Sequence, residues 1–136
     1  MKNFLLKMIF LGGLALGLVM SLAPNRYHHF NMFLPAELRS WVNANDNAAN
    51  LGAFFLLASV ALRLPRLRVR DGSRLPAAVV RLIESRLGAV AALMLLVCAI
   101  EFAQIFIPGR AADIQDVATG WSGIFAAWLL AEIQRD

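Results

Sequence analysis

The chain has 136 residues, of which 60% are hydrophobic and only 16% are charged. Soluble domains are about 45–50% apolar and about 25% charged, so this composition excludes an ordinary soluble globular domain. The net charge is +4, and no segment between the apolar blocks is long enough to fold as a second domain.

The hydrophobic residues gather in four blocks, each close to the roughly 20 residues that a helix needs to cross a bilayer. Lipid cannot satisfy the hydrogen-bonding groups of an extended backbone, so a helix is the expected conformation of every block. We therefore predict an all-α fold with one domain over residues 1–136. It is an integral membrane bundle of four transmembrane helices at about residues 8–23, 48–64, 87–107 and 117–133.

The first block, Met8 to Ala23, has two interpretations. Ser21 and Ala23 form the small-x-small pattern of a signal-peptide cleavage site. Pro24 would then directly follow the cut, which is unfavourable for processing. We therefore favour an uncleaved membrane anchor over a signal peptide.

Arginines concentrate between the second and third blocks. The segment from Arg63 to Arg86 holds seven of them against two acidic residues. Loops rich in Lys and Arg remain in the cytoplasm, so we predict that this loop is cytoplasmic, and Lys2 and Lys7 place the N-terminus on the same side. Four crossings then put both the N- and C-termini in the cytoplasm. The loops at residues 24–46 and 108–116 face outward.

The same arginines have two possible roles. Arginine clusters can bind nucleic acid, but beside transmembrane segments they also contact anionic lipid headgroups. We favour lipid headgroups at the Arg63–Arg86 loop and expect no nucleic-acid partner. An amphipathic helix from Leu75 to Arg86 fits the inner membrane surface. A second short helix from Pro35 to Val42, with Trp41 at headgroup depth, fits the outer one.

Two adjacent histidines, His28 and His29, lie in the first outward loop. Adjacent positions do not share a helical face. No cysteine is nearby, and the pair lacks the ligand spacing of a metal site. We expect no metal and no cofactor here.

The third block contains two polar residues, Glu101 and Gln104, spaced three apart and therefore on nearly one helical face. A charge inside a membrane costs roughly 2.5–3.5 kcal/mol on insertion scales, and such groups usually serve a function. Arg110, Asp113 and Asp116 follow in a short loop at the predicted outer surface. Pairing of Arg110 with one of the three carboxylates would lower the cost of burying them.

Asn50 lies one turn inside the second helix from the same surface and adds an amide. Polar residues of this kind also act as interhelical hydrogen-bond partners worth about 1 kcal/mol each, so a purely structural role is the competing interpretation. Six polar residues within residues 101–116 are more than such a role needs. We therefore favour a polar site at the outer leaflet, open to lipid on one side and water on the other.

Glycines mark two predicted helix faces. Gly120 and Gly123 lie along one face with Asp116, so another helix or a substrate chain can approach closely there. Gly13 and Gly17 form a similar small-residue pair in the first block. We expect close helix contacts at both faces.

Together these residues carry a family resemblance. Glu101-x-x-Gln104, Pro108-Gly109-Arg110, Asp113 with Asp116, and then Gly123, resemble the signature of the VanZ-like family of small membrane proteins. Two positions depart from its pattern. Gly120 stands where the family often has Asn, and Asp46-Asn47-Ala48-Ala49-Asn50 stands where many members have Asp-Lys-x-x-His.

The resemblance implies a multi-pass protein of the bacterial cytoplasmic (inner) membrane that is concerned with the cell envelope. The namesake of the family is associated with resistance to a lipoglycopeptide antibiotic, and relatives occur near exopolysaccharide functions. The resemblance does not imply a particular reaction.

Three functions remain open at this point. The first, which we favour, is a cell-envelope membrane protein whose outer site binds a lipid-linked glycan or similar amphiphile. The second is a membrane enzyme, a hydrolase or transferase acting on an envelope lipid, with Glu101 as the candidate general acid or base. The third is a structural or assembly subunit. The expected ligand-binding residues are Asn50, Glu101, Gln104, Arg110, Asp113 and Asp116.

Overall fold

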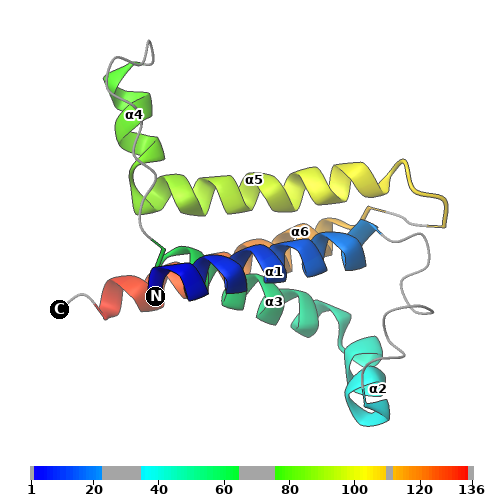
Figure 1. Cartoon of the computed structure of the whole chain (residues 1–136). Coiled ribbons are helices and arrows are strands. Elements are labelled where there is room, and N and C mark those ends of the chain that lie inside the picture. Colours follow the sequence, from blue (N-terminus) through cyan, green and yellow to red (C-terminus); the bar gives the residue numbers. More distant parts are fainter. Residues whose placement is uncertain (1, 23–34, 65–75, 110–111, 135–136) are drawn as a thin grey trace.

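The computed structural model describes residues 2–22, 35–64, 76–109 and 112–134. These ranges contain six helices and no strand, which confirms the predicted all-α class (Figure 1). The helices are α1 (Lys2–Leu22), α2 (Ala36–Ala44), α3 (Asp46–Ala61), α4 (Ala77–Ile83), α5 (Arg86–Gln104) and α6 (Ile114–Ile133). His28, His29, Arg110 and most of the arginine-rich loop lie outside the described residues.

The four long helices α1, α3, α5 and α6 form a bundle, and the two short helices stand at its opposite ends (Figure 1). The most extensive contact joins α3 to α6, and α5 packs against α6. α1 contacts both α3 and α5. The start of α1 and the end of α6 lie at the same end of the bundle as α4, and α2 lies at the other end (Figure 1).

The bounds of the long helices differ from the predicted ones for local reasons. Asp113 starts α6 three residues early, because its Oδ1 accepts a hydrogen bond from Gln115 N at 2.8 Å. Ser85 caps α5 by accepting from Gly88 N at 2.9 Å. α5 ends at Gln104, and a turn leads to Gly109, whose φ of 79° lies in the left-handed region that favours glycine.

Two of the described helices are long and apolar enough to cross a membrane. They are Asn3–Leu22 in α1, with mean hydropathy 2.1, and Arg86–Gln104 in α5, with mean hydropathy 2.0. Large apolar side chains also face outward on the long helices, such as Leu95 at 70% exposure and Ile133 at 72%. Apolar exposure of this extent is unusual on a soluble monomer.

The core lies where α3, α5 and α6 meet. Its buried residues are Ala58, Leu62, Val90, Leu93, Val97, Ile124 and Ala127. α3 rests on the glycine face of α6. A Cβ at Gly123 would overlap the carbonyl oxygen of Leu51, and one at Gly120 would lie 3.0 Å from Val97 Cγ1. The two glycines thus determine how closely the helices approach.

Candidate functional site

The last turn of α5 directs Glu101 and Gln104 into the bundle. Glu101 is 8% exposed and Gln104 is 1% exposed, whereas Phe102 between them is 64% exposed. Gln104 Nε2 donates a hydrogen bond to the carbonyl oxygen of Ser21 in α1 at 3.2 Å. The three-residue spacing therefore produces one polar face at this end of the bundle.

Glu101 also contacts the beginning of α6. Its Oε2 accepts a hydrogen bond from the backbone N–H of Asp113 at 3.1 Å. In a capping box, the residue three positions into the helix accepts from the N-cap N–H. Here Glu101 of the neighbouring helix does so, and the side chain of Asp116 is directed elsewhere.

Asp116 is 6% exposed and is bonded to α3. Asn50 Nδ2 lies 3.3 Å from Asp116 Oδ1 and 3.3 Å from the Asp116 carbonyl oxygen. Beside this contact, Asn47 Nδ2 donates to Gln115 Oε1 at 3.4 Å. The amides of α3 therefore meet the first turn of α6.

Five of the six predicted site residues take part in three polar contacts at this end of the bundle, which join Asn50 to Asp116, Asp113 to Glu101, and Gln104 to Ser21. We call the five residues the polar cluster. Asp113 contributes its backbone N–H and its helix-capping carboxylate, and its side chain is exposed. The sequence interpretation missed Ser21 and Gln115, since a carbonyl and an exposed glutamine give no recognisable pattern. Within the described part of the chain, no group of three His, Cys, Asp or Glu side chains is placed to hold a metal ion.

One acceptor of the cluster is not satisfied. Within the described residues, Gln104 Oε1 is buried and accepts no hydrogen bond. A buried polar group without a partner costs about 1–3 kcal/mol, so such a group usually reflects a function or a missing partner.

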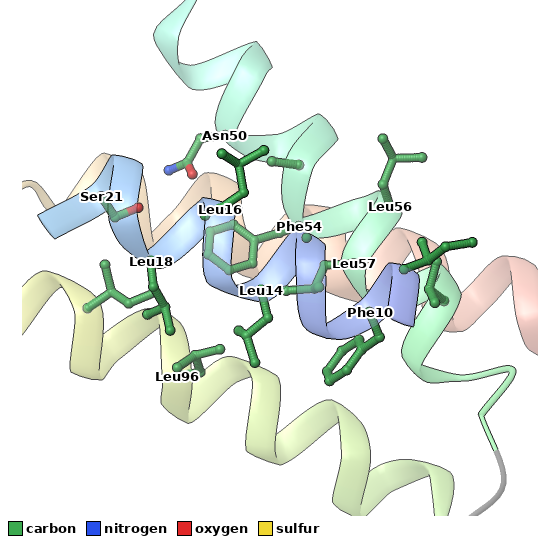
Figure 2. Close-up of a pocket in the computed structure, with 16 residues that line it drawn as sticks. Phe10, Leu14, Leu16, Leu18, Ser21, Asn50, Phe54, Leu56, Leu57 and Leu96 are labelled. Carbon is green, nitrogen blue, oxygen red and sulfur yellow. The ribbon is translucent and has the colours of Figure 1, made fainter. Parts of the chain in front are cut away.

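A largely apolar pocket of about 330 Å³ adjoins the cluster, between α1, α3 and α5 (Figure 2). Its volume lies within the ~300–1,000 Å³ range of small-molecule sites. Phe10, Leu57 and Leu96 are among its apolar lining residues, and Ser21 and Asn50 form a polar end. Ser21 and Asn50 are also the residues that bond to Gln104 and Asp116, so the pocket and the cluster meet at these two residues.

The glycines of α1 border this pocket rather than a close helix contact. Gly17 lines it, and a Cβ there would have no atom within 4 Å. A Cβ at Gly13 would meet only Leu57 Cδ1, at 3.9 Å. Within the described residues, Gly13 and Gly17 therefore do not lie at a close helix contact, in contrast to the expectation from the sequence.

An all-helical fold with two apolar helices of membrane-spanning length is consistent with a membrane protein. The family model described as VanZ/LLP1 matches residues 4–135, so the chain belongs to the VanZ/LLP1 family and the resemblance is confirmed. No curated protein and no solved structure gave a significant match. Family membership relates the protein to the cell envelope.

Proposed function

We propose that the protein is a four-span bundle of the bacterial cytoplasmic membrane, with both termini in the cytoplasm. α6 has 20 residues and is about 30 Å long at roughly 1.5 Å per residue, which matches the hydrocarbon core. The positions of α2 and α4 at opposite ends of the bundle support two membrane interfaces (Figure 1). Arg63 and Arg86 lie toward the α4 end, which is then the cytoplasmic one.

At the outer end, the pocket and the polar cluster form a binding site for an amphiphile of the envelope, such as a lipid-linked glycan. One observation carries this proposal: the apolar pocket ends at Ser21 and Asn50, which are bonded to the buried cluster. A hydrocarbon chain occupies the pocket, and the polar head lies against the cluster. Apolar burial supplies about 25 cal/mol per Å² for the chain.

The cluster has the chemistry to recognise a hydroxylated head. Gln104 Oε1 and the carboxylate of Glu101 are acceptors, and sugar hydroxyls are donors. Hydrogen bonds to charged groups contribute about 1.5–3 kcal/mol each. Arg110, which follows the α5 turn in the sequence, would add a cation for a phosphate linkage. Polar contacts thus bind the head group, and the shape of the apolar pocket accommodates the hydrocarbon chain.

The test is photocrosslinking of the reconstituted protein with a lipid-linked glycan that carries a diazirine on its hydrocarbon chain. Gly17→Leu places a side chain in the pocket and should reduce labelling several-fold. Gly12→Leu is the matched control, because Gly12 also has no atom within 4 Å of its Cβ position and does not line the pocket. Equal labelling of Gly17→Leu and wild type would refute the proposal that the hydrocarbon chain occupies the pocket. An equal loss of labelling in Gly17→Leu and Gly12→Leu would show that the effect is not specific to the pocket.

A further inference from the structure

A second cavity, of about 160 Å³, lies at the other end of the bundle between α3, α5 and α6. Its polar lining residues are Ser59, Arg63, Arg86 and Gln134. The cavity is separate from the polar cluster, since the two sites share no residue. The function proposed for the outer pocket therefore does not account for this cavity.

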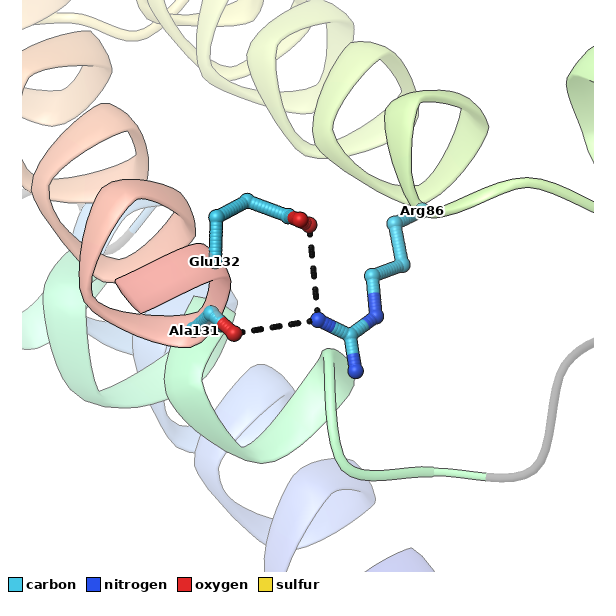
Figure 3. A network of polar contacts seen from close by, with 3 residues as sticks. All are labelled: Arg86, Ala131 and Glu132. Atoms are coloured by element: carbon cyan, nitrogen blue, oxygen red, sulfur yellow. Dashed lines mark hydrogen bonds and ion pairs between the residues drawn. The ribbon is translucent and has the colours of Figure 1, made fainter. Parts of the chain in front are cut away.

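Both arginines are held in place by the ends of helices. Arg86 Nη1 donates to the Ala131 carbonyl oxygen at 3.2 Å and lies 3.4 Å from Glu132 Oε1 (Figure 3). Arg63 Nη1 donates to the Ser59 carbonyl oxygen at 2.9 Å. These bonds neutralise the partial negative charge at the C-terminal ends of α3 and α6, and they orient the two guanidinium groups beside the cavity.

Most donors of the two guanidinium groups are still available. A guanidinium presents five N–H donors, and within the described residues only Nη1 of Arg63 and of Arg86 is used. Glu132 is the one carboxylate bonded to either group there, so one positive charge remains in excess. Two guanidinium forks with excess positive charge match the geometry of a phosphate.

The position of α4 places this cavity at headgroup depth. α4 contacts α5 and is turned away from the bundle axis (Figure 1). Its Val79, Leu82 and Ile83 are 38%, 50% and 38% exposed. A Cβ at Gly88 would overlap the carbonyl oxygen of Leu82, so the α4–α5 junction is closely packed and holds α4 in this orientation. An apolar helix face turned out beside the cavity fits the membrane–water boundary.

We propose that this cavity binds the phosphate of an anionic phospholipid of the inner leaflet, through Arg63 and Arg86. The orientation of the protein is taken from the proposed function, and the outer pocket plays no part in this binding. The lipid phosphate accepts hydrogen bonds from both guanidinium groups and competes with Glu132 for Arg86. Its acyl chains run along the exposed apolar surface of the bundle.

The experiment measures retention of phosphatidylglycerol by the full-length protein in native mass spectrometry, with phosphatidylcholine and inorganic phosphate as comparison ligands. Arg63→Gln and Arg86→Gln should each weaken phosphatidylglycerol binding about tenfold, as expected for loss of a charge-assisted contact. Arg81→Gln is the matched control, because Arg81 is exposed on α4 and does not line the cavity. Glu132→Gln removes the competing carboxylate and should strengthen binding.

Wild-type affinity in both arginine variants would overturn the proposal, and so would an equal loss in Arg81→Gln, which would indicate surface charge alone. Inorganic phosphate binding as tightly as the lipid would reassign the cavity to a soluble anion. Among the described residues Arg63 bonds only to its own helix, so Arg63→Gln keeps the test valid if Arg86→Gln fails to fold. Outer-pocket labelling should be unchanged in these variants, so failure here is distinguishable from failure of the proposed function.

Discussion

Gly123→Ala should destabilise the bundle, although alanine is the better helix former. The new Cβ would overlap the Leu51 carbonyl oxygen and lie 3.0 Å from Phe55 N. Both neighbours are backbone atoms of α3, which cannot rotate away, so we take the upper part of the ~1–3 kcal/mol cost of overpacking. The gain in helix propensity offsets about 1 kcal/mol of this. The net loss of folding free energy is therefore about 2 kcal/mol.

Gly52→Ala is the matched control. Gly52 lies in the middle of α3, and a Cβ there has no atom within 4 Å. This variant should gain up to about 1 kcal/mol from helix propensity alone. The difference between the two alanine variants, about 3 kcal/mol, isolates the packing term.

The assay is reversible unfolding of the purified protein in mixed micelles by titration with sodium dodecyl sulfate, followed by tryptophan fluorescence. Trp121 and Trp128 of α6 lie on either side of Gly123 and report on the same helix. Equal stability of Gly123→Ala and Gly52→Ala would show that α3 does not rest on the glycine face of α6.

Two further predictions concern the polar cluster. Gln104→Leu removes an unsatisfied buried acceptor together with one hydrogen bond to Ser21. Stability in the same titration should therefore change by less than about 1 kcal/mol, while photolabelling by the glycan lipid should fall. A large loss of stability with normal labelling would contradict this prediction. Asp113→Ala removes the N-cap of α6 and should lower the folding free energy by about 1 kcal/mol, whereas the stability of Asp113→Asn should remain close to wild type. An equal loss of stability in both variants would exclude capping as the cause.

Local periodicity was sufficient to predict part of the site. The spacing of Glu101 and Gln104 predicts one shared face, and both side chains are buried on the bundle side of α5. The same reasoning does not separate Asp113 from Asp116. Which one caps the helix depends on where α6 begins, and there the backbone N–H of Asp113 donates a hydrogen bond to Glu101 in another helix.

Features that depend on the distance between helices were not predictable from the sequence. Small residues at Gly17 and Gly123 look equivalent, yet one borders a pocket and the other contacts a backbone. The spacing between helix axes decides the outcome, and no local pattern encodes it. The pairs Asn50–Asp116 and Arg86–Glu132 are likewise 66 and 46 residues apart in the chain.

Polar contacts near both ends of α6 have a structural role. Asn50 joins α3 to Asp116 near one end of α6, and Arg86 joins α5 to Glu132 near the other. These residues of α6 are about 24 Å apart at roughly 1.5 Å per residue.

Sliding α6 by one turn would break both contacts, which fixes its position along the bundle. Asn50 and Asp116 are therefore accounted for by the architecture. Gln104 Oε1 is not, since within the described residues it gains no hydrogen bond from being buried. A purely structural role predicts that replacing Gln104 and replacing Asn50 have similar effects. A ligand site predicts that Asn50 variants lose stability while Gln104 variants lose binding.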